Sequence, residues 1–337
     1  MAEINICGVT AKAGEHAVGA LPVTTLADGT FLDIPFHVLN GARSGPVLLL
    51  TAVSHGDAIT GMEVIRQVME QVDLSYLAGA IVAVPVQNPI GFEWGERNTP
   101  VDRNNMNRMY PGNPKGWFTE QMTAAISPLC MAADALIDWH GGGEGLAIHY
   151  VLIDREPGEL GRQIRDMAFA YGLPFVYDGA PAGPAAAYAG AIDEYMVSLG
   201  KPVIVAEVGS TLELSFDQIG ESVRGVFNVM KHLGMQEGKP VLPAEQWLIK
   251  ERPLLRPKNG GVFYPECGPA YLNKWVPKGT LLARVRNSRT LEVIEEITAP
   301  CEQTVFLMLR GRMTKVHPGE YAYILGNLAN AEHVVNA

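Results

Sequence analysis

The sequence is poor in charge and has no basic cluster. Asp, Glu, Lys and Arg make up 18% of its 337 residues, and 36 acidic residues outnumber 26 basic ones, so that the formal net charge is −10. A globular protein typically carries about 25% charged residues. The acidic balance argues against nucleic acid or an anionic membrane as the main partner. The low charge density, with 47% hydrophobic residues, favours a large buried surface, and we expect a homo-oligomer.

Cysteines and long apolar runs are also scarce. The four cysteines, Cys7, Cys130, Cys267 and Cys301, form no C-x-x-C pair, which argues against a disulfide framework and a structural zinc knot. No stretch approaches the roughly 20 apolar residues of a membrane span. The first residues lack the basic start and apolar run of a signal peptide. We therefore expect a cytoplasmic protein with no membrane partner.

The region from residue 46 to about 234 alternates short apolar runs with helical periodicity, and at about 150 residues per domain the chain has room for two domains. Buried strands are expected at 47–53, 80–86, 135–139, 147–153 and 202–207, and helices at 59–72, 119–134, 158–171, 192–199 and 216–233. Alternating strands and helices indicate an α/β fold with a mixed, largely parallel sheet flanked by helices.

The pattern changes after residue 238, where short strand-like segments follow one another between turns. We expect strands at 261–264, 281–286, 290–297, 303–309 and 319–324. The sequence therefore predicts an α/β domain over residues 1–240 and a small all-β C-terminal domain over residues 241–337.

Two histidines follow apolar strands and lead directly into glycine. They are His55 in Ser54-His55-Gly56 and His140 in Trp139-His140-Gly141. In open α/β sheets, ligands bind beyond the carboxyl ends of the strands, and neutral imidazole is the commonest metal ligand. A histidine that merely caps a turn would explain either one alone, but two in the same setting favour a metal site. Glu207 ends a third apolar strand, where a base that activates water belongs.

A long loop without periodicity is expected at residues 96–116. Its segment 97–108 holds three arginines and four asparagines in an otherwise charge-poor chain. Such a loop suits recognition of a carboxylate by arginine, whereas taken alone it is explained better as a solvated loop whose asparagines form turns.

In order along the chain, these motifs resemble the succinylglutamate desuccinylase/aspartoacylase family, which is related in fold to the zinc carboxypeptidases. The resemblance rests on H-G-D, R-N-T-P-V-D-x-x-N-M-N-R-x-Y-P-G, D-W-H-G-G and A-E-V-G, within residues 40–235. The C-terminal part is similar to the β-rich domain of that family and to a lipoyl-like barrel. It has no Met-Lys-Met hairpin, so we expect a structural or oligomerising role for it.

The resemblance implies a zinc enzyme that hydrolyses the amide of a small N-acyl amino acid. It implies that His55 and His140 bind the zinc and that Glu207 is the general base and acid. It also implies that Arg97, Asn107 and Arg108 hold the substrate carboxylate, with Arg108 stabilising the oxyanion. N-acyl diaminobutyrate deacetylases are a plausible neighbour because of the negative charge and Glu144, and we expect the loop 179–190 to line the pocket.

One position departs from the family motif H-x-x-E. Its glutamate would be the third zinc ligand, but the chain has Ala58 at that place. Three explanations are open: Asp57 is a shifted ligand, Glu63 reaches back from the next helix, or the site is metal-free or weakly metallated. The corresponding functions are an active metal-dependent deacylase or a catalytically impaired, carboxylate-binding protein. A metallocarboxypeptidase is a further alternative that differs in its substrate.

Overall fold

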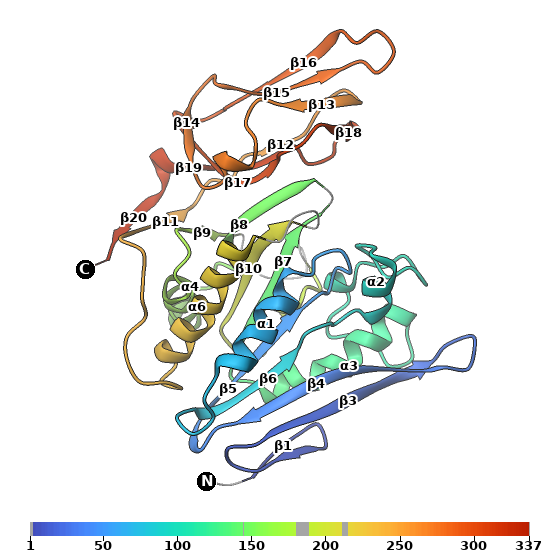
Figure 1. The fold of residues 1–337 in the computed structure, drawn as a ribbon, viewed down its shortest axis with the longest axis vertical. Coiled ribbons are helices and arrows are strands. Elements are labelled where there is room, and N and C mark those ends of the chain that lie inside the picture. Colours follow the sequence, from blue (N-terminus) through green and yellow to red (C-terminus); the bar gives the residue numbers. More distant parts are fainter. Residues whose placement is uncertain (1–2, 144, 180–188, 211–214, 337) are drawn as a thin grey trace.

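The fold is described from a computed structural model, which covers residues 3–143, 145–179, 189–210 and 215–336. Its centre is a 14-stranded mixed sheet that runs through almost the whole chain (Figure 1). Four neighbouring strands at the middle of the sheet are parallel to one another, namely β6 (Ala78–Val84), β5 (Arg43–Ala52), β7 (Ala135–Gly142) and β10 (Val203–Ser210). These are four of the expected apolar strands, and the α/β fold with a mixed sheet is confirmed.

Helices cover both faces of this sheet, as the periodicity predicts. One face packs against α1 (Thr60–Gln71), α4 (Gly158–Tyr171) and α6 (Phe216–His232). The other face packs against α3 (Phe118–Ala132) and α5 (Ile192–Ser198). Helical residues three and four positions apart, such as Val64, Ile65 and Val68 of α1, supply the apolar stripe that is buried against the strands.

The first 40 residues form strands that the sequence analysis did not predict. They are β1 (Ile4–Ile6), β2 (Val9–Ala11), β3 (His16–Thr25) and β4 (Phe31–Asn40). Strands β3 and β4 are antiparallel, and β4 extends the main sheet by pairing with β6. Residues 89–94 form the short helix α2 (Pro89–Trp94), which Asn88 caps by accepting a hydrogen bond from Gly91 N.

The other edge of the main sheet joins the two halves of the chain. β8 (Leu146–Ile153) is antiparallel to β10 on one side and to β17 (Gln303–Arg310) on the other. β9 (Phe175–Asp178) lies parallel to β11 (Glu245–Ile249). Strands of the C-terminal part therefore continue the sheet of the N-terminal part, and the division at residue 240 stays a prediction.

The rest of the C-terminal part is also made of strands. A separate four-stranded antiparallel sheet contains β13 (Gly261–Pro265), β15 (Leu281–Arg286), β16 (Val293–Thr298) and β18 (Thr314–Val316). The main sheet also takes in β12 (Leu254–Leu255), β14 (Trp275–Pro277), β19 (Tyr323–Asn327) and β20 (Glu332–Val335). The strand expected at 319–324 thus begins and ends later. Within the described ranges, no helix is long and apolar enough to cross a membrane.

Candidate active site

Three adjacent strands bring polar side chains into one row across the sheet. Glu207 on β10 lies opposite His140 on the parallel strand β7 and opposite Tyr150 on the antiparallel strand β8. Side chains of direct cross-strand neighbours lie on the same face of a sheet. The register therefore places the carboxylate between the imidazole and the phenol, on the face opposite α4 and α6.

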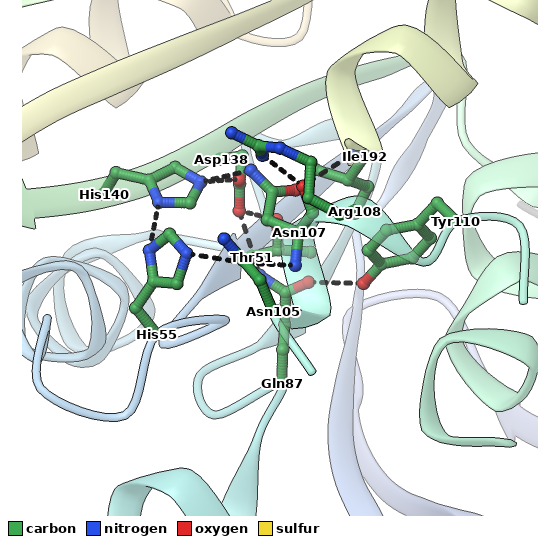
Figure 2. A network of polar contacts seen from close by, with 10 residues as sticks. All are labelled: Thr51, His55, Gln87, Asn105, Asn107, Arg108, Tyr110, Asp138, His140 and Ile192. Atoms are coloured by element: carbon green, nitrogen blue, oxygen red, sulfur yellow. Dashed lines mark hydrogen bonds and ion pairs between the residues drawn. The ribbon is translucent and has the colours of Figure 1, made fainter. Parts of the chain in front are cut away.

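The third polar element, His55, reaches this row from the loop after β5. The loop passes so close to α2 that a Cβ on Gly56 would lie 2.0 Å from the backbone of Gly91, which explains the glycine that follows the histidine. Nδ1 of His55 lies 3.1 Å from Nδ1 of His140, and both side chains are buried (Figure 2).

The opposite nitrogen of each ring lies close to a side-chain oxygen. Nε2 of His55 lies 3.1 Å from Oδ1 of Asn105. Nε2 of His140 lies 2.8 Å from Oδ2 of Asp138, a fully buried carboxylate. Oδ1 of Asn105 assigns the ring proton of His55 to Nε2, so that the Nδ1 lone pair of His55 faces Nδ1 of His140. Two ring nitrogens at that distance need a proton or a cation between them, because two bare lone pairs would repel.

The carboxylate of Asp138 is itself fixed by a buried network (Figure 2). Thr51 Oγ1 donates to Oδ1 of Asp138 over 2.6 Å, and Gln87 Nε2 donates to the same oxygen over 3.0 Å. Tyr110 in turn donates its hydroxyl proton to Oε1 of Gln87 over 2.6 Å. Supports of this kind behind a histidine are typical of metal sites, where they set the ring orientation.

The two histidines therefore suit two of the ligand positions of a zinc ion. A third protein ligand is not placed with them: among the described residues, no group of three or more His, Cys, Asp and Glu is arranged to hold a metal ion. Ala58 is buried, and a Cβ on Gly141 would lie 3.5 Å from its own, so the methyl group faces the backbone that follows His140. Position 58, where the family motif has its glutamate, thus lies next to the two histidines.

Asp57 and Glu63, the two candidates for the missing third ligand, differ in their surroundings. Both oxygens of Glu63 accept hydrogen bonds from Arg66 on the same helix, each over 2.7 Å, and these bonds hold the pKa of Glu63 at about 2. That carboxylate is committed to its helix, and the structure gives the Glu63 explanation no support. Oδ1 of Asp57 is buried without a hydrogen-bond partner among the described residues, and burial raises the pKa of Asp57.

A cavity of about 260 Å³ opens over the row of polar side chains. Its polar lining includes His55, Arg97, Asn107, Arg108, His140, Asp193, Glu207 and Arg252, and its apolar lining includes Leu146, Ile148, Leu152, Val205, Met308 and Ile324. Drug-sized ligands occupy pockets of about 300–1,000 Å³, so this cavity suits a small molecule.

The arginine-rich loop divides between the cavity and the surface. Arg97 lines the cavity, and within the described part of the chain its guanidinium makes no hydrogen bond or ion pair. Arg108 lines it too and donates to the carbonyl of Asn107. Arg103, which was not among the expected site residues, instead pairs with Glu96 over 3.0 Å, and its side chain is 74% exposed.

The asparagines of the loop serve both the turns and the site. Oδ1 of Asn105 accepts a hydrogen bond from Asn107 N, which forms a turn, and also contacts His55. Oδ1 of Asn107 accepts a hydrogen bond from Ile192 N at the start of α5, and its Nδ2 lies 3.1 Å from Nε2 of His140. Asn107 thus contacts the protein at both ends of its amide. Its role in binding substrate stays a prediction.

Burial and nearby charges shift the pKa values of the site. Burial, and then the charge of His140, hold the pKa of His55 well below its usual value. Burial lowers the pKa of His140, but the carboxylate of Asp138 raises it by more, so the net shift is upward. Burial raises the pKa of Glu207 above 4.5, although His140 and Arg97 partly oppose it.

Three cavity residues escaped the sequence analysis. Tyr150 lies beside Glu207, Arg252 donates from Nη1 to the Tyr150 hydroxyl over 2.9 Å, and Asp193 lies in the first turn of α5. No motif marks Arg252, since it comes from the C-terminal part, whereas the acidic pair at the start of a helix was visible in Asp193-Glu194. Glu144 and most of the loop 179–190 lie outside the described residues, but Ala191 lines the cavity.

Comparisons with known proteins show which family the chain resembles in sequence and fold. The sequence model of the succinylglutamate desuccinylase/aspartoacylase catalytic domain matches residues 44–233. The chain is 28% identical over 229 residues to N-alpha-acetyl-L-2,4-diaminobutyric acid deacetylase of Halomonas elongata, a match that covers 65% of this chain and 64% of that relative.

Solved structures share the fold over nearly the whole chain. The product-bound ectoine utilization protein EutE (DoeB) of Ruegeria pomeroyi is 25% identical with a TM-score of 0.80, covering 93% of this chain and 94% of that one. A succinylglutamate desuccinylase of Silicibacter sp. TM1040 is 24% identical with a TM-score of 0.80 and the same coverage. The chain belongs to the succinylglutamate desuccinylase/aspartoacylase family.

Proposed function

We propose that this protein hydrolyses the amide bond of a small N-acyl amino acid. The observation that carries the proposal is the shared cavity, which is lined by two facing histidines, the partly buried Glu207 and Arg97, whose guanidinium pairs with none of the described residues. Relatives named as a deacetylase and a desuccinylase support the same reaction class. The small volume of the cavity favours a small amide over a peptide, and thus a deacylase over a carboxypeptidase.

His55 and His140 are the residues that would hold a zinc ion, with Asp57 as the candidate for the third ligand. When bound, zinc acts as a Lewis acid toward the acyl carbonyl and makes water a stronger nucleophile at neutral pH. Asp138 and Asn105 hold the two rings in the required orientation.

Glu207 handles the proton. Because burial raises its pKa, its carboxylate is a stronger base than an exposed glutamate. It takes the proton of the attacking water and returns it to the leaving amine. Arg108 stabilises the negative charge that develops on the acyl oxygen, and Arg97, with Asn107, orients the carboxylate of the amino acid.

A second candidate function follows from Ala58. Without its family glutamate, the site is able to bind a carboxylate through Arg97 and Arg108 while lacking the metal affinity that catalysis needs. The chain would then be a catalytically impaired binding protein with an intact cavity.

Metal analysis with a hydrolysis assay separates the two functions. We expect the purified protein to bind about one zinc per chain and to release amine from N-acetyl or N-succinyl amino acids in a zinc-dependent manner. Binding of N-acyl amino acids without zinc and without turnover would instead support the impaired protein. We also propose that the protein is a homo-oligomer and that it is cytoplasmic. Light scattering of the purified protein tests the oligomeric state.

A further inference from the structure

Two buried carboxyl side chains, one of which lines the cavity, have no role in the mechanism above. Asp193, in the first turn of α5, is 4% exposed and lines the cavity. Asp154, which follows the last residue of β8, is 7% exposed. The mechanism uses Glu207 as the only carboxylate that exchanges protons with substrate, so these two acids need another explanation.

Neither acid is satisfied within the described part of the chain. Oδ1 of Asp193 and Oδ2 of Asp154 are buried without a hydrogen-bond partner, and no Lys, Arg or His forms an ion pair with either side chain. Burial, and then the charge of Asp193, raise the pKa of Asp154 to about 8. An ionised carboxylate that is buried without a counter-charge costs free energy. These two side chains therefore favour a ligand that brings a positive charge.

The place of these acids relative to the reacting groups suits one end of a substrate. On β8, residues 150, 152 and 154 alternate onto the same face, and Tyr150 is the cross-strand neighbour of Glu207. At about 3.3 Å per residue, Asp154 lies on the order of 13 Å along the strand from that row. Asp193 lies nearer, since it follows Ile192, whose backbone N–H donates to Asn107.

The cavity thus carries both signs of charge. The guanidiniums of Arg97 and Arg108 line it together with the carboxylate of Asp193. A ligand that satisfies both must itself carry an anion and a cation, as an amino acid with a second, free amine does.

We propose that Asp193, with the carboxyl group of Asp154 near it, binds the free ammonium group of the substrate side chain, so that the substrate is an N-acyl diamino acid. This inference rests on the proposed deacylase function and names its substrate class. A primary ammonium offers three donors and matches two carboxylates. A metal ion suits the pair less well, because the described residues provide no group of three or more possible ligands.

The test compares two substrates that differ only in the group at the end of the side chain, which is charged in one and apolar in the other. Nα-acetyl-2,4-diaminobutyrate ends in an ammonium, whereas Nα-acetylnorvaline has a methyl group in its place. We expect the zinc-loaded protein to prefer the diamino substrate in kcat/KM by more than about tenfold, because a site built for a polar group discriminates strongly against its absence. Asp193→Asn should lower this preference at least about tenfold, mainly through KM, and Asp154→Asn should lower it less.

Controls exclude general damage. Asp33→Asn removes a carboxylate from β4, three strands from β7 in the sheet, and should leave the preference as in the wild type. Circular dichroism and thermal unfolding verify that Asp193→Asn and Asp154→Asn are folded.

Calorimetric binding keeps the inference separate from catalysis. Free 2,4-diaminobutyrate should bind the wild type more tightly than norvaline does, and this difference should disappear in Asp193→Asn. Equal cleavage of both acetyl substrates would overturn the ammonium site while leaving the deacylase intact. Asp193-dependent binding without any turnover would support the ammonium site and refute the deacylase. Binding of Ca²⁺ or Mg²⁺ that is lost in Asp193→Asn would overturn the assignment in favour of a metal cation.

Discussion

Nδ1 of His55 faces Nδ1 of His140 over 3.1 Å, and both rings are held from behind by oxygen acceptors. In the zinc site proposed above, the two rings therefore already face each other before the ion binds. Little reorganisation of the side chains is needed on binding, which favours affinity. Variants of the ligands, their supports and the proton acceptor measure how much each part contributes to zinc binding or hydrolysis.

Asp138→Asn should weaken zinc binding by about 10–100-fold, because the carboxylate that fixes the His140 ring is lost. Competition with a chromophoric chelator measures the affinity. Asp33→Asn serves again as the matched control. An unchanged affinity in Asp138→Asn would show that the buried network holds the fold and not the metal.

Ala58→Glu should restore the missing ligand and raise zinc affinity by more than about tenfold, together with kcat. Ala58→Gln has the same shape without the charge and should give a smaller increase. Equal effects of Glu and Gln would argue against a carboxylate ligand at this position.

Asp57→Asn provides the complementary measurement. If Asp57 is the shifted ligand, its replacement should abolish most zinc binding in the otherwise unchanged protein, since one of three protein ligands is removed. Retention of wild-type affinity, together with a gain in Ala58→Glu, would show that the present site works with two histidines alone.

Glu207→Gln should lower kcat by about 10²–10⁴-fold with little change in zinc affinity, because it removes the proton acceptor and leaves the predicted ligands in place. The base is active when ionised, and burial raises its pKa above 4.5. Rates of the wild type should therefore rise with pH through that raised pKa and then level off. If the residual rate of Glu207→Gln rose with pH at low pH as the wild-type rate does, the rise would belong to another group.

Asp193→Asn should make the protein more stable at pH 8, by about 1 kcal/mol, because it removes a buried carboxylate that lacks a partner. The folded-state pKa values of Asp193 and Asp154 are raised from 3.8 to about 6 and about 8, mainly by burial. Their contribution to stability is therefore full below pH 3.8 and is lost as the pH rises through these values. Urea unfolding at pH 5 and pH 8 measures the difference, and an equal loss of stability in wild type and variant would contradict this explanation.

The sequence predicted the parts of the site that lie at strand ends. His55, His140 and Glu207 each follow an apolar run, and the topology of parallel strands brings such ends to one edge. The loop at 96–116 was also predicted and holds only the short 3₁₀ helix Met106–Arg108. These features are local, so their residue patterns carry them.

Other features depend on contacts between distant segments. Strand β4 mixes Pro35 and charged Asp33 with apolar residues, so no clear period marks it, and its pairing with β6 defines it. Arg252 lies between β11, which pairs with β9, and β12, which joins the sheet through β19, so long-range pairing brings it to the cavity. Register and long-range pairing of this kind leave no short motif in the sequence.

The C-terminal part of the chain supplies part of the cavity wall, and this bears on how substrate preference can change among relatives. The family's catalytic domain ends at residue 233 in this chain, yet Arg252, Met308, Tyr321 and Ile324 line the same cavity as the histidines. Substitutions in the C-terminal strands are thus able to change which substrate fits without touching the groups that break the bond. Exchange of this segment between relatives should transfer substrate preference while the hydrolytic machinery stays constant, which makes the C-terminal part the natural place to redesign specificity.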